Sequence, residues 1–493
     1  MLLQLHRTPL HQISGSIYMK RAKDVSKIKH NSKTTARNGT AHIISPDDRA
    51  AAGKALRDKV PREQHCSWKE FKGRPNPIDL LHKSDAGRLK ELVPIRYGRM
   101  LQSPFAFYRG AAGVMASDLA RTPNTGLKVQ ACGDCHLRNF GGFATPERNI
   151  IFDINDFDET SPAPWEWDVK RLVASFVLAA RSNGLSDSQG RDCAETAARS
   201  YREHMREFSR MDPLRAWYSN IDADDFMGLV PKGYQKQVKK RIEKASVVSG
   251  SELDFPKLAG TVGGQIRITD QPPLIFHPEL TRTPEAEAIL DQIFRAYRET
   301  LAEDRRMLLD RYRLVDVAIK VVGVGSVGRR CWIALMMSET NNPLFLQFKE
   351  AASSVLEPYA GKSAYSHHGQ RVVMGQRLMQ PASDIFLGWV TGLEGRQLYI
   401  RQLRDAKIKP LVETFNGEML DIYAMACGWV LARAHSKVSE ISATISGYLG
   451  SSSDEFDVAM GKFALAYADQ AEHDYAALKA AVRKGKITVY QES

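Results

Sequence analysis

A block of β-type sequence, residues 315–403, stands between two long stretches of helical type. Its runs VDVAIKVVG, RRCWIALMM, PLFLQFKEA, DIFLGWV and RQLYIRQL are rich in branched and aromatic residues, which is typical of strands. The run HHGQRVVMGQRLMQ within the block predicts a helix. On both sides of the block, apolar residues recur three and four positions apart, as on amphipathic helices. This arrangement predicts an α+β protein with a small antiparallel β lobe and a large helical lobe.

The chain divides into four expected segments. Residues 1–65 are predicted to be a disordered basic tail, and residues 66–310 a helical lobe. Residues 311–405 are predicted to form the β lobe, and residues 406–493 to be helices that return to the helical lobe. Within the helical lobe, two short strands, LKVQAC and NIIFDIND, are expected on either side of a glycine-rich bend at Gly141 and Gly142. A helix is expected from about Trp167 to a stop at Gly184.

Charge and cysteine content narrow the functional classes. The net charge is +12, of which residues 1–40 supply +7 through eight Lys or Arg against one Asp. No basic and aromatic pattern follows this tail, so nucleic-acid binding is disfavoured and a phosphorylated small molecule is the better anionic partner. No run approaches the roughly 18 apolar residues that span a bilayer, so no membrane partner is expected. The six scattered cysteines are typical of reduced thiols, and the protein is expected to be cytoplasmic.

Acidic and amide side chains concentrate in two neighbouring runs, GDCHLRNFG (133–141) and FDINDFDE (152–159). Asp134 and Asn139 are expected on a tight loop after the first strand, and Asp153, Asp156 and Asp158 at the end of the next strand. Hard oxygen ligands in this number favour a Mg²⁺ site that takes further oxygens from phosphates. A separate Asp nearby can accept a hydroxyl proton. The alternative is an acidic turn that only caps local structure.

The same region contains the spacing CGDCH, with Cys132, Cys135 and His136. This is the spacing of a c-type haem attachment site, and it also contains the CxxC of a redox pair. Haem attachment requires export, for which the N-terminus shows no signal, and a redox pair is expected at the start of a helix. Both alternatives are therefore disfavoured.

A glycine-rich run, VGVGSVGRR, lies between two predicted strands. Its spacing matches a loop whose backbone N–H groups approach phosphate, and the residues concerned are Gly323, Gly325, Ser326 and Gly328. No helix follows, which disfavours a dinucleotide-binding fold. About twenty residues later Lys349 stands in an apolar strand, where it is either a nucleotide-binding lysine or a simple edge-strand charge. Lys320 precedes the glycines and is therefore on the wrong strand.

Several runs together resemble the bacterial DUF2252 family, a likeness that covers most of residues 70–480. They are SPFAFYRGAA, CGDCHLRNFG, FDINDFDET, WEWDVKRL, GVGSVG, GQRLMQ, SDIFLGW and YIRQLRD. That family is similar to protein-kinase-like and aminoglycoside-phosphotransferase-like enzymes. The resemblance implies a two-lobe fold, an ATP cofactor with Mg²⁺ or Mn²⁺, and transfer of phosphate to a hydroxyl of an acceptor. It also implies the roles of five residues: Asp134 as the catalytic base, Asn139 and Asp156 as metal ligands with Asp153 in competition, and Asp168 as the residue that braces the loop.

The order of the motifs differs from that of an ordinary kinase. The glycine loop and Lys349 follow the catalytic loop, and WVLARAHSK (429–437) resembles the helix that normally precedes that loop. A circular permutation of the kinase-like fold is therefore expected. No helix glutamate is available for Lys349, so Gln376 or Glu357 is the expected substitute. This departure keeps open a nucleotide-binding pseudokinase-like protein, and transfer of AMP also stays open.

The acceptor is not readable from the sequence. Four residues could line an anionic substrate pocket or could be structural, namely Arg96, Arg99, Tyr108 and Arg109.

Overall fold

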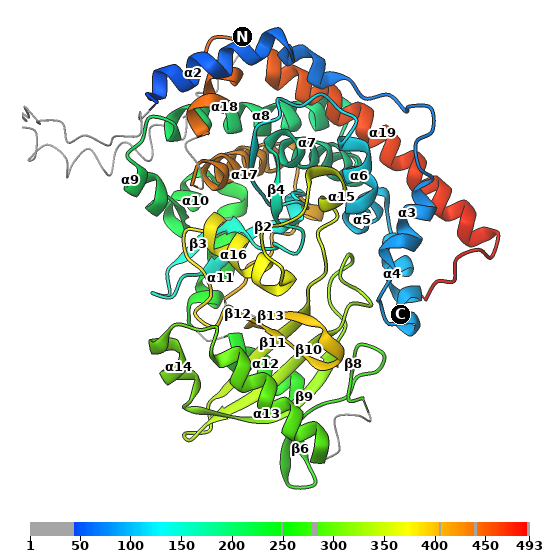
Figure 1. The fold of residues 1–493 in the computed structure, drawn as a ribbon, viewed down its shortest axis with the longest axis vertical. Coiled ribbons are helices and arrows are strands. Elements are labelled where there is room, and N and C mark those ends of the chain that lie inside the picture. The colour runs from blue at the N-terminus through cyan, green and yellow to red at the C-terminus, as the bar shows by residue number, and fades with distance from the viewer. Residues whose placement is uncertain (1–43, 248–249, 279–283, 404–405, 438–440, 491–493) are drawn as a thin grey trace, which may run out of the picture.

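The computed structural model describes residues 44–247, 250–278, 284–403, 406–437 and 441–490. It is a mixed α+β structure with antiparallel sheets, which confirms the α+β part of the expected fold class. Helices gather at one end of the long axis and a sheet at the other (Figure 1). The basic tail expected at residues 1–40 lies outside the described residues. None of the described helices is long and apolar enough to cross a membrane.

Long helices from both halves of the sequence form the core of the helical end. α7 is the most buried of them, and every residue from Trp165 to Ala180 is buried. The Trp165 indole stacks on Tyr201 with ring centroids 5.6 Å apart, so truncation of this side chain to alanine would cost roughly 3–5 kcal/mol. The helices of this group are α7 (Trp165–Ser182), α8 (Asp187–Phe208), α17 (Gly417–Lys437), α18 (Ser442–Leu449) and α19 (Glu455–Arg483).

Shorter helices from the N-terminal region pack on this core. They are α2 (Pro46–Ala55), α3 (Pro77–Ser84), α4 (Val93–Met100), α5 (Pro104–Gly110) and α6 (Ala112–Leu119). The disordered tail expected up to residue 65 is therefore too long. Ser45 caps α2, and Arg57, just after the helix, donates to the backbone oxygen of Tyr448 at 2.8 Å. These bonds give residues 44–65 a fixed place on α18.

The β block forms one antiparallel sheet, as the sequence predicts. Its strand order is β12–β13–β11–β10–β9–β8. The strands are β8 (Ile275–Phe276), β9 (Tyr312–Lys320), β10 (Cys331–Ser338), β11 (Pro343–Glu350), β12 (Gly388–Thr391) and β13 (Gln397–Gln402). The helix expected within the block is α16 (His368–Met379), and the short α15 (Glu357–Ala360) precedes it.

The lower boundary of the β lobe differs from the expected residue 310. β8 pairs with β9, and the Tyr297 hydroxyl of α13 donates to the backbone oxygen of Phe386 at 2.6 Å. Residues from about 250 onward therefore pack with the sheet, because their apolar side chains share its core. These elements are α12 (Gly250–Leu258), β6 (Ala259–Val262), β7 (Gln265–Ile268), α13 (Pro284–Arg298) and α14 (Glu303–Leu309).

Two small antiparallel sheets carry the acidic runs. β1 (Lys128–Ala131) pairs with β4 (Ser161–Pro164), and β2 (Phe140–Ala144) pairs with β3 (Ile150–Ile154), which also pairs with β5 (Ile221–Asp222). Three helices follow in the sequence: α9 (Pro213–Tyr218), α10 (Ala223–Leu229) and α11 (Lys232–Val247).

The glycine-rich bend expected at Gly141 and Gly142 is wrong, because both residues lie within strand β2. A Cβ atom on Gly141 would lie 2.6 Å from the backbone oxygen of Ile408. Gly142 and Ile408 exchange two backbone hydrogen bonds of 2.9 and 2.7 Å. The glycines therefore serve close strand packing rather than a turn.

Candidate active site

A polar cavity of about 1050 Å³, partly open to solvent, lies where the helical end meets the β9–β10 connection. It brings together residues that are up to 275 positions apart in the sequence, from Leu80 to Val355. The predicted site residues that line it are Asp134, Asn139, Asp156, Asp158, Gly323, Gly325 and Ser326. Asp153, Gly328 and Lys349 are not among its lining residues.

The loop after β1 is held in place by the first turn of α7. The Asp168 carboxylate accepts from the backbone N–H groups of Cys132 and Gly133 at 2.6 and 2.9 Å. His435 of α17 lies 3.1 Å from the same carboxylate. Gly133 has φ +86°, and a Cβ there would lie 2.2 Å from the backbone oxygen of Glu159. Asp168 thus braces the loop that carries Asp134.

Asp134 and Asn139 face the cavity from this loop. The Asn139 amide donates to the Asp134 backbone oxygen at 2.7 Å, which closes the loop on itself. The Asp134 carboxylate accepts from Arg171 Nε at 2.6 Å. Burial raises the pKa of Asp134, although Arg171 acts in the opposite direction. A raised pKa makes a carboxylate a stronger base.

Asp153 is separated from the cavity. It lies on β3 with 0% exposure and accepts from Arg433 of α17 at 2.7 Å, where Arg433 is also fully buried. Burial raises the pKa of Asp153 to about 6 in spite of the neighbouring guanidinium. Of the two competing metal positions, the structure therefore brings Asp156 to the cavity and keeps Asp153 in the core.

Asp158 connects the helical end to the β lobe. Its carboxylate pairs with Lys349 and accepts from the Tyr399 hydroxyl at 2.7 Å. The Ser326 hydroxyl lies 3.3 Å from it. Burial opposes ionisation of Asp158, but Lys349 outweighs it and lowers the pKa to about 2.

Lys349 is buried in β11, opposite Tyr399 of β13. Burial alone would lower its pKa, yet the carboxylates of Asp156 and Asp158 raise it well above the ordinary value. The expected partners Gln376 and Glu357 are wrong, because Gln376 donates to Gln380 and Glu357 lies near Arg371. Lys349 pairs instead with an acid of the FDINDFDE run.

The glycine-rich connection between β9 and β10 covers one side of the cavity. Arg99 donates to the Gly323 backbone oxygen, and a Cβ on Gly325 would lie 3.4 Å from the Arg109 backbone oxygen. Gly328 lies behind the loop, against the Arg88 side chain. A strand follows the loop, as the sequence predicts, and not a helix.

The CxxC alternative finds no support in this geometry. Cys132 and Cys135 are buried with free thiols, and burial raises the pKa of the Cys135 thiol well above its ordinary value. A protonated, inaccessible thiol is a poor nucleophile. His136 lines the cavity, and within the described part of the chain its Nδ1 atom has no hydrogen-bond partner.

The four residues considered for an anionic pocket have separate roles. Arg96 pairs with Asp85, the buried Tyr108 donates to the Arg171 backbone oxygen, and Arg99 holds the glycine loop. Arg109 lines the cavity, its Nε atom has no hydrogen-bond partner among the described residues, and burial lowers its pKa to about 10.

Sequence reasoning missed Arg171 and Tyr399. Arg171 follows Asp168 by three positions on one helix, so it lies on the same face, and this spacing could have revealed it. Tyr399 shares the side of the sheet with Lys349 only through strand register, which local sequence does not specify.

The described residues contain no group of three His, Cys, Asp or Glu side chains that could hold a metal ion. Asn139, Asp156 and Asp158 nevertheless face one cavity, and their oxygen atoms are of the kind that Mg²⁺ prefers. Such a set fits an ion that keeps several waters and takes its remaining oxygens from a phosphate.

Comparison with curated proteins and with solved structures gave no significant match. One family profile does match, described as uncharacterized proteins conserved in bacteria, and it covers residues 88–481. This range contains the acidic runs, the glycine loop and Lys349. The chain therefore belongs to the DUF2252 family.

Proposed function

We propose that the protein is an ATP- and Mg²⁺-dependent phosphotransferase, with Mn²⁺ as an alternative ion, that acts on a hydroxyl of a small molecule or a protein. One observation carries the proposal. Asp134, Asn139, Asp156 and Asp158 line the same cavity as the glycine loop, although the two groups are far apart in the sequence. Convergence of acids, an amide and a phosphate-type loop is what phosphoryl transfer requires.

In this proposal each residue has a defined task. The backbone of the glycine loop binds phosphate oxygens, and Lys349 contributes positive charge next to Asp158. Asp134 orients the acceptor hydroxyl and takes its proton. Asn139, Asp156 and Asp158 would hold the ion, which neutralises charge on the phosphates when it is bound.

We also propose a kinase-like two-lobe fold in circularly permuted order. The helix α16 lies between β11 and β12 in the sequence, and Lys349 is near the end of β11. His435, near the end of α17, lies 3.1 Å from Asp168, which caps the loop carrying Asp134. The C-terminal end of α17 thus lies next to a loop almost 300 residues earlier in the sequence, as a rewired connection requires.

Incubation with ATP labelled at the γ-phosphate, in parallel with ATP labelled at the α-phosphate, tests the proposal. Asp134→Asn should abolish γ-label transfer and retain nucleotide affinity, while Asp304→Asn on exposed α14 should have no effect. Transfer of the α-label would indicate AMP transfer. Absence of any Mg²⁺- or Mn²⁺-dependent ATP binding would overturn the enzymatic proposal.

A second candidate is a nucleotide-binding protein without turnover. Two ion pairs favour it, because Arg171 holds the Asp134 carboxylate and Lys349 is engaged by Asp158. Groups held in such pairs must be released before they can act on a substrate. Metal-dependent ATP binding without consumption of ATP, in the wild type and in Asp134→Asn alike, would select this candidate.

A further inference from the structure

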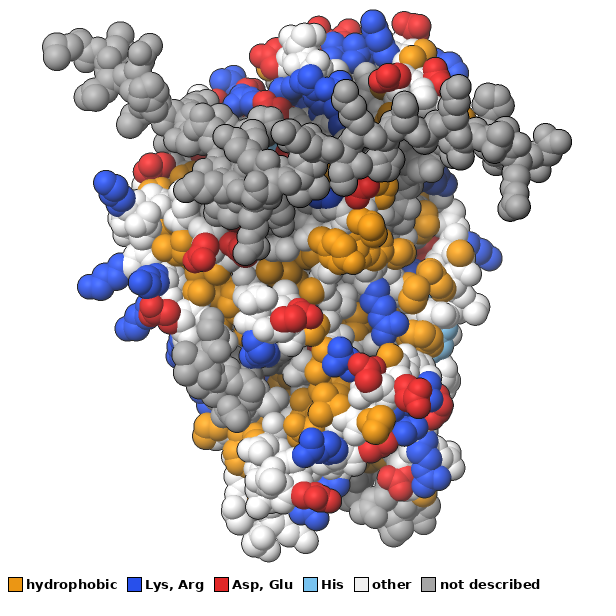
Figure 2. Space-filling view, turned by 90° about the vertical axis from the view of Figure 1, so that its left-hand side faces the viewer, with side chains coloured by type: hydrophobic (Ala, Val, Ile, Leu, Met, Phe, Trp, Pro, Cys, Tyr) orange, Lys and Arg blue, Asp and Glu red, His pale blue; other side chains and the backbone are white. Residues whose placement is uncertain are grey.

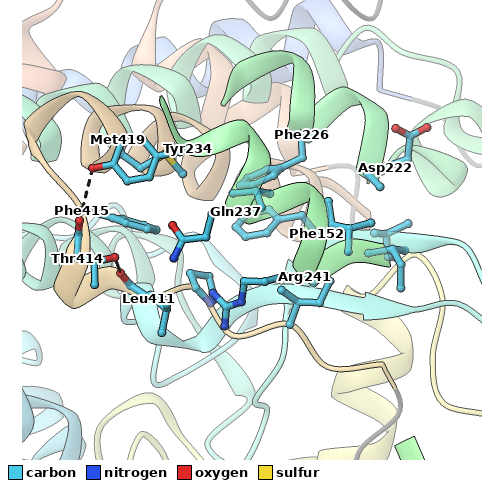
Figure 3. A pocket seen from close by; sticks show the side chains of 18 residues that line it. Phe152, Asp222, Phe226, Tyr234, Gln237, Arg241, Leu411, Thr414, Phe415 and Met419 are labelled. Carbon is cyan, nitrogen blue, oxygen red and sulfur yellow. Dashed lines mark hydrogen bonds between the residues drawn. The ribbon is translucent and has the colours of Figure 1, made fainter. Parts of the chain in front are cut away.

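A second cavity, of about 680 Å³ including its open mouth, lies between β3, α10, α11 and the segment before α17 (Figure 3). Its lining is almost entirely aliphatic and aromatic. The apolar lining residues are Ile150, Ile151, Phe152, Ala223, Phe226, Tyr234, Val238, Ile242, Ile408, Pro410, Leu411, Phe415 and Met419.

Ring packing and backbone bonds hold the walls in place. Phe152 stacks on Phe226 with centroids 5.0 Å apart and meets Tyr423 edge-on at 5.5 Å. Phe415 meets the same tyrosine at 5.6 Å. On the opposite wall, Ile408 is tied to Gly142 by paired backbone hydrogen bonds. The cavity is therefore preformed and does not depend on one adjustable side chain.

One helix contributes both apolar and polar groups to the cavity. Positions 234, 237, 238, 241 and 242 of α11 follow helical spacing and all line it. The lysines of α11 lie outside this lining. The helix is thus amphipathic, with its apolar stripe turned toward the cavity.

Arg241 is the cationic side chain of the lining, and it forms no hydrogen bond or ion pair with any residue that the structure describes. In Figure 3 its guanidinium lies beside the Gln237 amide, near Leu411. The lining also contains one acid, Asp222, which caps α10 by accepting from the Asp225 N–H at 2.8 Å. The Asp222 carboxylate points away from Arg241 in Figure 3. An unmatched positive charge therefore borders an apolar space.

We propose that this cavity binds an anionic amphiphile, with its apolar chain against the hydrophobic walls and its acidic head on Arg241 and Gln237. Apolar walls with few polar groups select a hydrocarbon body, and the free guanidinium selects an acid over an alcohol. The face in Figure 2 shows hydrophobic side chains at mid-height, with Lys, Arg, Asp and Glu side chains around them. This site is separate from the proposed phosphotransferase cavity, and its occupation does not depend on that activity.

Calorimetric titration of the full chain with decanoate, octanoate and decanol tests the proposal. We expect decanoate to bind at least tenfold more tightly than decanol, and roughly tenfold more tightly than octanoate because two methylenes are added. Arg241→Ala should lower decanoate affinity at least tenfold and leave decanol affinity unchanged. Lys240→Ala is the matched control, since it removes one positive charge from the same helix outside the cavity, and it should change neither affinity.

Val238→Trp should fill the cavity and abolish binding of both probes, with an unchanged far-ultraviolet circular dichroism spectrum to show that the protein is folded. Equal affinity for decanoate and decanol would overturn the assignment of Arg241. Full binding by folded Val238→Trp, or an equal loss from Lys240→Ala and Arg241→Ala, would overturn the site itself.

Discussion

Two carboxylates five residues apart, Asp153 and Asp158, occupy opposite environments. Asp153 and its partner Arg433 are both completely buried, whereas the Asp158 side chain is 27% exposed and borders the polar cavity beside Lys349. The pKa of Asp153 is raised to about 6 by burial. The pKa of Asp158 is lowered to about 2, because Lys349 outweighs burial. One ion pair belongs to the core and the other to the candidate site.

The difference shows that density of acids in a sequence does not define a metal site. Asp153 is paired with Gly141 in the β2–β3 ladder, and its side chain is directed into the helical core. Asp158 lies beyond the strand end, where the chain turns toward the β lobe. Strand alternation and strand length therefore decide which acids reach the cavity.

The largest expected effect comes from breaking the core pair. Asp153→Ala should lower the free energy of unfolding by about 3–5 kcal/mol, because it leaves the buried Arg433 charge without a partner. Among the described residues, two of the three Arg433 nitrogens already have no hydrogen-bond partner. Urea unfolding measures this loss. The double variant Asp153→Leu/Arg433→Leu should recover part of the lost free energy of unfolding. An Asp153→Ala variant as stable as the wild type would contradict a structural role for this ion pair.

The two acids should also respond to pH with opposite signs. The pKa of Asp158 is below its unfolded value, so its stabilisation is lost as pH falls from about 4 to 2. The pKa of Asp153 is above its unfolded value, so the free energy of unfolding decreases as pH rises from about 4 to 6. Each effect is on the order of 2 kcal/mol. Urea unfolding from pH 2 to 7 should show that Asp158→Asn removes the first slope and Asp153→Asn the second; the same change from both would contradict the assignment.

A substitution of Lys349 tests the candidate site, and this prediction rests on the proposed function. Lys349→Met should weaken MgATP binding at least tenfold, since a charged hydrogen bond is worth about 1.5–3 kcal/mol. Its effect on the free energy of unfolding should stay below about 2 kcal/mol, because Asp158 is left next to a partly open cavity. Equilibrium dialysis with labelled ATP measures the affinity. Lys320→Met on β9, which is separated from β11 by β10, is the control, and an equal loss of affinity there would contradict a specific role.

The smallest expected effect concerns the contact of the glycine loop with Asp158. The Ser326 hydroxyl lies 3.3 Å from the carboxylate, which is a long hydrogen bond. Ser326→Ala should therefore change the free energy of unfolding by about 0.5 kcal/mol. A loss as large as that of Asp153→Ala would show that the loop is part of the core and would remove the contrast between the two regions.

Most of the secondary structure was predictable from local pattern. Helix α16 and the strands β9, β10, β11 and β13 match their expected runs, whereas β12 begins only at Gly388 of the run DIFLGWV. α7 ends at Ser182, two residues before the predicted stop at Gly184. The exceptions share a physical cause. Gly141 lies in a strand because another chain segment approaches it closely, and residues 250–310 join the sheet through contacts with distant strands. Neither contact can be recognised from the local sequence.

The kinds of residue in the candidate site were predictable from the sequence, but which of these residues reach the cavity was not. Residue type and spacing selected Asp134, Asn139, Asp153, Asp156, Asp158 and the glycine loop, and all of these except Asp153 and Gly328 line the polar cavity. Only the tertiary structure assigned Asp153 to Arg433, and only it made Asp158 the partner of Lys349. Those pairings join residues 280 and 191 positions apart, and such contacts arise from packing of whole elements rather than from any local pattern.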